Sequence, residues 1–300
     1  MTTALEIFQG RFGRVALLDI NQGLVDHAHP HCHVLIKLGG ADSAFRVRDR
    51  FCPLTDETMV LVNAWEQHAY TPQRRSAGTL ILALYIEPSW LAELDRLFGA
   101  SGQPGFFPQP VARVTRHIRT ASYELAEALA GGVSAGDRMD LLHTLMVQVI
   151  EQFSQWRDRT IRPCIHGDFR IRKALRHLRD CIGEPFILED VARKAGLSRS
   201  QLFRGFKSDL GITPKLYFNC LRMELAISCL AEEDERLAIL ADRLGFSMQC
   251  HFTRFFRGHL GITPSRYRRV VRVAEPMRSF PARGTMRSPS GRVAAQRASA

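Results

Sequence analysis

The 300-residue chain has no apolar run that approaches the roughly 18–20 residues of a membrane span. Its first ten residues lack the basic and then apolar pattern of a secretory signal. The seven cysteines are an odd number without a tight pairing pattern, which does not suit a disulfide framework. We therefore expect a cytoplasmic protein with reduced thiols and no membrane partner.

The charge of the chain is distributed unevenly. Lysine and arginine (41) exceed aspartate and glutamate (30), which gives a formal net charge of +11. Residues 1–160 carry a net charge of −2, residues 161–270 carry +8 and residues 271–300 carry +5. This asymmetry predicts a near-neutral domain joined to a domain that meets a polyanion, although a basic surface also serves solubility.

The hydrophobic pattern divides the chain into two predicted domains and a tail. Up to about residue 87, short alternating runs separated by turn residues predict the strands of a sandwich or barrel. Helical patterns follow as far as residue 160, and residues 161–270 are predicted to be nearly all helix. Residues 271–300 are rich in Pro, Ser, Arg, Ala and Gly, which predicts a basic, disordered tail.

The basic segment contains an internal repeat. The sequence Gly-Ile-Thr-Pro at 211–214 recurs at 261–264, and Arg204-Gly-Phe-Lys aligns with Arg254-Phe-Phe-Arg. Each copy predicts a helix, a tight turn and a second helix. In the first copy Gly196 ends one helix and Ser198 caps the next, and Ser247 takes the capping place in the second copy.

The second helix of each copy has an apolar face and an opposite polar face. This pattern is typical of helix-turn-helix units, in which the exposed face of the second helix enters the major groove of DNA. A connecting helix from about 214 to 230 would be about 25 Å long, enough to hold two recognition helices about one DNA turn apart. Helical repeats that bind another protein are the alternative, and the charge favours DNA.

These motifs resemble the DNA-binding domain of the AraC/XylS family of transcriptional regulators. The matching residues are Ala192-Arg-Lys-Ala-Gly-Leu-Ser198, Arg204 to Tyr217, Ala241-Asp-Arg-Leu-Gly-Phe-Ser247 and the segment from Arg254 to Arg268. The resemblance covers about a third of the chain. It implies a multidomain α+β fold, with an N-terminal cupin-like β-barrel followed by helices and a C-terminal all-α domain with two helix-turn-helix units.

The resemblance also implies which residues meet DNA. The family's base-contacting positions fall on Ser200, Phe203 and Arg204, and then on Gln249, Cys250, Thr253 and Arg254. Phe203 departs from the usual polar residue, so it either touches a thymine methyl group or packs. With the neighbouring basic side chains, the predicted DNA-binding set is Arg199, Ser200, Phe203, Arg204, Lys207, Gln249, Cys250, Thr253, Arg254 and Arg257, of which Lys207 and Arg257 suit phosphates.

Histidines alternate with other residues from 27 to 33, so an extended strand would direct all four of them to one face. Metal-binding relatives of the cupin-like barrel carry a His-x-His motif, an acidic residue about four positions on and a distant histidine. The corresponding residues here are His27, His29, His33 in place of the acid, and His68, which predict a divalent-metal site. A metal-free effector pocket formed by His31, His33 and His68 is the alternative.

Apolar residues between 139 and 156 follow a heptad spacing. This seam predicts either a homodimer interface or packing on its own barrel. The residues assigned to dimerisation are Met139, Leu142, Met146, Val149 and Phe153.

Together these features predict a regulator rather than an enzyme. We expect a sequence-specific activator that binds double-stranded promoter DNA, responds to a small-molecule effector and contacts RNA polymerase. The alternative is a metal-dependent cupin-type oxygenase fused to a DNA-binding module. A DNA-repair methyl acceptor is excluded, because that activity needs a cysteine cluster for zinc and an activated thiolate, and the sequence has neither.

Overall fold

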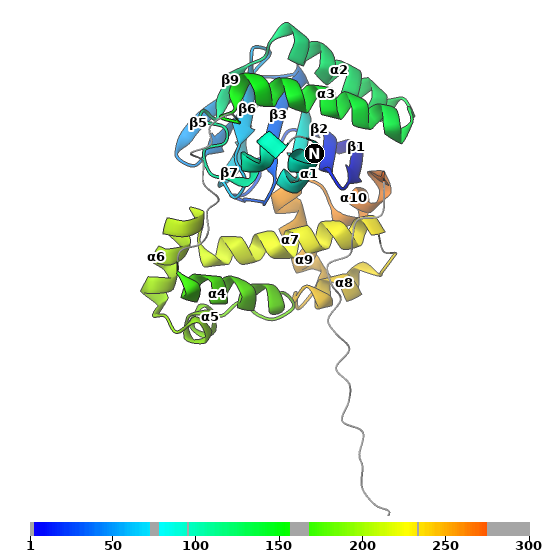
Figure 1. The fold of residues 1–300 in the computed structure, drawn as a ribbon. Helices are drawn as coiled ribbons and strands as arrows, with labels where there is room; N and C mark the ends of the chain where they lie inside the picture. Colours follow the sequence, from blue (N-terminus) through cyan, green and yellow to red (C-terminus); the bar gives the residue numbers. More distant parts are fainter. Residues whose placement is uncertain (1–2, 73–77, 95, 157–167, 233, 275–300) are drawn as a thin grey trace, which may run out of the picture.

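The computed structural model describes residues 3–72, 78–94, 96–156, 168–232 and 234–274. The N-terminal half contains nearly all of the strands (Figure 1). Their bounds are β1 (Thr3–Gly10), β2 (Gly13–Ile20), β3 (Cys32–Gly40), β4 (Ser43–Val47), β5 (Arg50–Leu54), β6 (Thr58–Val62), β7 (His68–Thr71), β8 (Thr79–Ile86) and β9 (Val111–Arg113). A last strand, β10 (Val271–Val273), comes from the other end of the chain.

The strands form two sheets that pack on each other. The larger sheet has the order β10-β1-β2-β8-β3-β6-β9, and the smaller has the order β5-β4-β7. Alternate side chains of both sheets, such as Phe45 and Ile81, share one hydrophobic cluster. The described strands make two separate sheets rather than one closed ring, so the prediction is corrected from a closed barrel to two packed sheets.

The predicted strand across the four alternating histidines is also wrong. Only His33 belongs to β3, and residues 27–31 form an irregular loop with a single bridge between His27 and His68. Pro30 accounts for this departure, because proline lacks the N–H that a ladder needs and restricts the residue before it.

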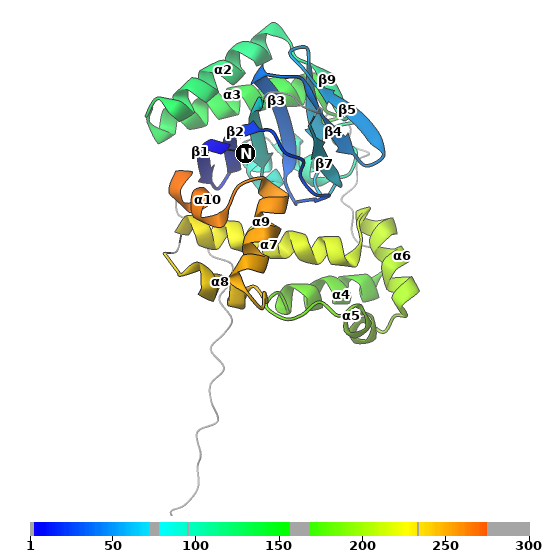
Figure 2. The same cartoon turned by 180° about the vertical axis from the view of Figure 1, so that it is seen from behind.

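Helices α2 and α3 cover the sheets on the side away from the C-terminal half, and two short helices precede them in the chain (Figure 2). In chain order these helices are α1 (Pro88–Leu94), the 3-10 helix η1 (Arg96–Gly102), α2 (Arg116–Ala130) and α3 (Ala135–Phe153). On α3, Leu142, Met146 and Val149 are fully buried in the core of this domain. Met139 and Phe153 pack against the same core. The heptad seam is therefore covered by its own domain, and we correct its assignment as a dimer interface.

The C-terminal half is helical, as the sequence predicts. Its helices are α4 (Phe169–Asp180), α5 (Leu188–Ala195), α6 (Arg199–Leu210), α7 (Pro214–Glu232), α8 (Leu237–Arg243), α9 (Gln249–Leu260) and α10 (Pro264–Val270). The long helix α7 runs along the boundary with the sheets, and both figures show it between them and α4 (Figures 1 and 2). Its 19 residues span about 28 Å at 1.5 Å per residue. Among the described residues, no helix combines the length and apolarity that a membrane span needs.

The two halves share a continuous interface. Strand β10 pairs in parallel with β1, with Ile7 opposite Val271. Residues of α7, α9 and α10 belong to the same hydrophobic cluster as the sheets. The predicted tail boundary at residue 271 is therefore too early, because 271–273 form a strand; residues 275–300 lie outside the described residues.

Candidate functional site

The first helix-turn-helix unit consists of α5 and α6. Gly196 ends α5 with a φ of 72°, in the left-handed region that glycine adopts without strain. Ser198 then caps α6: its side chain accepts a hydrogen bond from the backbone N–H of Gln201, whose side chain in turn accepts one from the N–H of Ser198. This reciprocal cap fixes where the second helix begins, as the sequence predicts.

Helix α6 buries Leu202 and Phe206 completely and directs the opposite face to solvent. All five residues predicted to meet DNA in this unit are exposed on it: Arg199, Ser200, Phe203, Arg204 and Lys207. Phe203 is 43% exposed, so it does not serve the core of this chain. Such an exposed aromatic side chain suits contact with a base or its methyl group.

The second unit consists of α8 and α9 and begins differently. Met248 occupies the N-cap position and makes no side-chain cap, whereas Ser247 lies 3.2 Å from the ring of His251 (Oγ to Nδ1). The predicted capping role of Ser247 is therefore wrong. Phe252 and Phe256 are fully buried, as their counterparts in α6 are.

The predicted DNA-contacting residues of α9 share one face, but a loop of the N-terminal half lies beside it. Gln249, Cys250 and Arg254 are exposed, while Thr253 and Arg257 are partly buried. All five line a cavity of about 780 Å³ whose other wall includes Gln22 and Gly23. No sequence pattern pointed to this loop, because its contacts depend on how the two halves pack.

Hydrogen bonds attach this loop to the end of α9. The guanidinium of Arg257 donates to the side-chain oxygen of Gln22 (3.2 Å), and the amide of Gln22 donates to the carbonyl of Gly261 (3.0 Å). The backbone N–H of Val25 donates to the carbonyl of Gly258 (3.0 Å). The corresponding residue of the first unit, Lys207, has no such contact with the N-terminal half among the described hydrogen bonds and is exposed.

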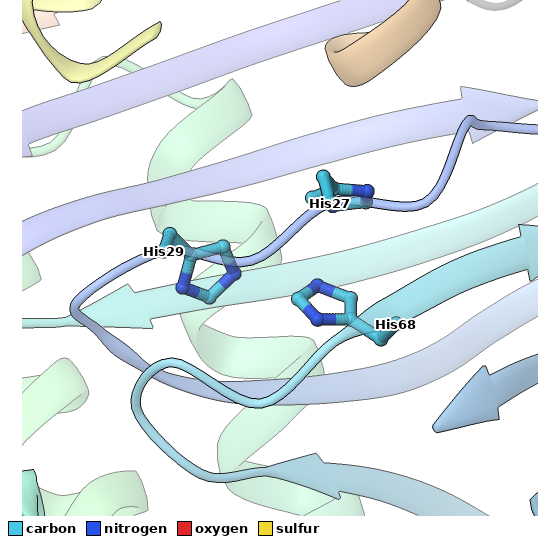
Figure 3. Close-up of side chains that lie close together, drawn as sticks. All are labelled: His27, His29 and His68. Atoms are coloured by element: carbon cyan, nitrogen blue, oxygen red, sulfur yellow. The ribbon is translucent and has the colours of Figure 1, made fainter. Parts of the chain in front are cut away.

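The histidines form a buried cluster beside this loop. His27, His29 and His68 each offer one ring nitrogen, and the three nitrogens lie within 4.8 Å of one another (Figure 3). The Nδ1 atom of His33 lies 3.2 Å from Nε2 of His29 and 3.3 Å from Nε2 of His68. The structure thus brings together the four residues that the sequence predicts as metal ligands.

The fifth histidine, His31, is directed elsewhere. Its Nε2 atom lies 2.9 Å from the carboxylate of Glu87, and its Nδ1 atom lies 3.8 Å from that of Glu224 on α7. The two described cavities are lined by other residues, from the 22–25 loop, α9 and its vicinity. The predicted effector pocket of His31, His33 and His68 stays a prediction.

Backbone carbonyls fix the orientation of three rings. The Nδ1 atoms of His27, His29 and His68 lie 2.8, 3.2 and 2.8 Å from the carbonyls of Val25, His31 and Glu66. Because a carbonyl only accepts hydrogen bonds, each of these Nδ1 atoms carries the proton. Each Nε2 atom therefore presents a lone pair, as in metal sites where the second ring nitrogen donates to a carbonyl.

The cluster is uncharged. Burial lowers the pKa of His27, His29 and His33 well below the usual value near 6.5, and the neighbouring imidazoles lower it further. Burial also lowers the pKa of His68 to about 4. The four rings are therefore neutral at physiological pH, which is the form that binds metals.

Comparisons with known proteins agree with the helix-turn-helix geometry. Residues 191–270 match a family model described as a helix-turn-helix domain. The HTH-type transcriptional activator RhaS of Citrobacter koseri is 27% identical over 218 residues, which cover 69% of this chain and 74% of RhaS. The regulatory protein PocR of Salmonella typhimurium is 32% identical, and the match spans 43% of either chain.

Solved structures of ToxT from Vibrio cholerae share the two-domain fold. The apo form of a ToxT variant aligns with a TM-score of 0.54 at 14% identity, covering 85% of this chain and 96% of ToxT. The wild type bound to an unsaturated fatty acid aligns with a TM-score of 0.51 at 10% identity, covering 90% and 95%. The chain carries the helix-turn-helix domain and the two-domain fold of AraC-type transcriptional regulators.

These similarities confirm the predicted two-domain α+β fold, apart from the closed barrel, and the predicted regulatory function. The relatives named above are regulators rather than enzymes, so the oxygenase alternative is not favoured. The predicted assignment of individual residues to bases and phosphates stays a prediction.

Proposed function

We propose that this AraC-family regulator activates transcription by placing α6 and α9 in successive major grooves, under the control of a small effector bound by the N-terminal half. The observation that carries the proposal is the pair of equivalent helices, each with a fully buried apolar face and an outward polar and basic face. The similarity to RhaS, a transcriptional activator, supports activation rather than repression.

Arg204 and Arg254 occupy equivalent places on the two exposed faces and are the proposed guanine contacts. Lys207 is the proposed phosphate contact of the first unit. The polar side chains around them, Ser200, Gln249 and Thr253, complete the proposed base contacts. A basic C-terminal half of net charge +8 favours association with DNA of any sequence.

The remaining assignments belong to the same proposal. Residues 1–160 would form the sensor domain and residues 161–270 the DNA-binding domain. We propose a cytoplasmic homodimer that contacts RNA polymerase at its promoters. Because the seam on α3 is buried, a dimer would have to use other residues, and sedimentation of the full chain at micromolar concentration tests whether it forms.

The test starts by selecting preferred sequences from random double-stranded DNA with the purified full chain. Arg204→Ala and Arg254→Ala should each weaken binding to the selected sequence by about 1–3 kcal/mol and relax base preference in one half of it. Arg11→Ala is the matched control, since Arg11 is an exposed, ion-paired arginine of the N-terminal half. Equal affinity of all three variants and the wild type would refute the assignment of these faces.

A further inference from the structure

The histidine cluster is not remote from the DNA-binding helices. The ring of His27 lies 6.3 Å from that of His259 on α9, measured between ring centroids. The ring of His33 stacks on Tyr85, and Arg14 covers Tyr85 and reaches Glu224 on α7. The cluster therefore lies at the face where the N-terminal half meets α7 and α9.

The cluster has more hydrogen-bond acceptors than donors. Three lone pairs, on Nε2 of His27, His29 and His68, result from the carbonyl contacts of the opposite ring nitrogens. His33 offers a single ring nitrogen toward two of them and can donate at most one proton from it. Buried acceptors that share a single donor are costly, and a cation bound among them would satisfy all three lone pairs.

The spacing fits a metal ion bound by imidazole. A tetrahedral ion with metal–nitrogen distances of about 2.0–2.1 Å places its ligand nitrogens roughly 3.3 Å apart. The Nδ1 atom of His33 lies 3.2 and 3.3 Å from Nε2 of His29 and His68. One ring nitrogen of His27 lies within 4.8 Å of a ring nitrogen of each of these two histidines, and Figure 3 shows the rings of His27, His29 and His68 close together. Neutral nitrogen ligands without a carboxylate select zinc, nickel, cobalt or copper over magnesium and calcium, which prefer oxygen.

One residue connects this cluster to α9. The carbonyl of Val25 accepts the ring N–H of His27 (2.8 Å), and the N–H of Val25 donates to the carbonyl of Gly258 (3.0 Å). Three residues earlier, Gln22 holds Arg257 and Gly261. An ion that fixes His27 therefore also fixes the segment that covers one edge of α9.

We propose that His27, His29, His33 and His68 bind one divalent transition-metal ion, and that this ion holds the 22–29 loop on α9. The bound ion favours the docked arrangement, in which Arg257 is engaged by Gln22 and the DNA-contacting face of α9 adjoins the loop. Metal loading thus weakens DNA binding by the second unit. This inference names the effector class of the proposed function and rests on it for the effect on DNA.

The first experiment measures binding without DNA. Untagged full-length protein, freed of metal by a chelator, is titrated with Co²⁺ and with Zn²⁺, and the stoichiometry and the Co²⁺ absorption bands are recorded. We expect one equivalent per chain with the strong bands of a four-coordinate nitrogen site. The double variant His29→Gln/His68→Gln should lose this binding while keeping its circular dichroism spectrum. His33→Ala is the second variant in case the double variant does not fold, and it should weaken the site.

The second experiment measures docking by hydrogen exchange of the backbone amides in α9, again without DNA. Metal should slow exchange there about tenfold in the wild type, within the usual range of coupling between sites. Gln22→Ala should still bind one equivalent but transmit less protection, because it loses both side-chain contacts with the end of α9. Operator affinity should fall by a similar factor on metal loading.

Each outcome decides a separate claim. No stoichiometric binding, or binding that survives the double variant, overturns the metal site. Stoichiometric binding without a change in α9 exchange overturns the coupling. If no preferred DNA sequence is selected, the proposed function fails, while the metal and exchange results stand, since neither experiment uses DNA.

Discussion

Replacing Glu224 with alanine should destabilise the whole chain, because it removes the counterion of a buried arginine at the boundary between the halves. Arg14 on β2 is 4% exposed, and its guanidinium lies 3.7 Å from the Glu224 carboxylate of α7. Burial lowers the pKa of Arg14, but the attraction of Glu224, together with smaller contributions from Tyr85 and Tyr267, holds the pKa above its usual value. Without Glu224, the buried positive charge has no carboxylate partner among its described contacts and keeps its contacts with Tyr85, whose ring centroid lies 3.9 Å away, and with Tyr267.

The magnitude follows from the geometry. Removing one partner of a buried ion pair costs about 3–5 kcal/mol. Here the separation exceeds that of a tight charged hydrogen bond, and the side chain of Glu224 is 19% exposed. These two features reduce the expected loss to about 2–3 kcal/mol. At a slope near 3 kcal/mol per molar urea, the midpoint of unfolding should fall by roughly 1 M.

Urea unfolding of the full chain, followed by fluorescence, measures this change. Trp65 stacks on Tyr217 across the same boundary, at 5.1 Å between ring centroids, and so reports on it. Arg14→Met/Glu224→Ala should be more stable than the sum of the single variants by about 1–2 kcal/mol, since it removes both charges. Glu124→Ala, at an exposed site on α2, is the control and should stay within about 0.5 kcal/mol of the wild type. Additive single variants would refute the pairing of Arg14 with Glu224.

Three further changes test the helix-turn-helix units. Ser198→Ala should lower the free energy of unfolding by about 1 kcal/mol, because it removes the N-cap of α6. Ser200→Ala, at the second residue of the same helix, should lower it little. Equal urea midpoints of the two variants would contradict the capping role of Ser198. Lys207→Ala should weaken binding to all DNA sequences alike and lower the slope of log affinity against log salt by about 1, so an unchanged slope would exclude a phosphate contact. Gly245→Ala should lower the melting temperature markedly, because the φ of 75° at this position is strained for alanine. In addition, the Cβ atom of alanine would lie 2.5 Å from the guanidinium of Arg222 and 2.7 Å from the carbonyl oxygen of Gly183. A variant as stable as the wild type would show that this turn relaxes.

The sequence was most informative where the structure is local. Hydrophobic period, turn glycines and caps are properties of neighbouring residues, so the end of α5, the bounds of α6 and the outward face of α6 followed from the pattern near Gly196 and Ser198. The second unit shows the limit even there, since Ser247 has the right type and spacing for a cap but contacts His251 instead. A side chain with two available partners cannot be assigned from spacing alone.

Properties that depend on long-range packing were beyond prediction. The heptad seam on α3 has the same pattern whether a second chain or its own domain covers it, and only the tertiary fold decides. The histidines were identified by type, but a strand was the wrong geometry for them: a loop lets His27 and His29 converge with His68 while His31 turns to Glu87. The hydrogen bond between Gln22 and Arg257 joins residues 235 positions apart, and no local sequence pattern at either residue predicts it.

The pairing of β1 with β10 has a consequence for how the protein is made. Strand β1 leaves the ribosome long before its parallel partner at Val271–Val273, which is synthesised only after both helix-turn-helix units. Until then one edge of β1 carries unpaired N–H and C=O groups. Such exposed strand edges can pair with a strand of another chain and so lead to aggregation. In a nascent chain that stalls before residue 271, this edge of β1 stays exposed. We expect such a chain to aggregate more readily than one in which β10 has paired with β1.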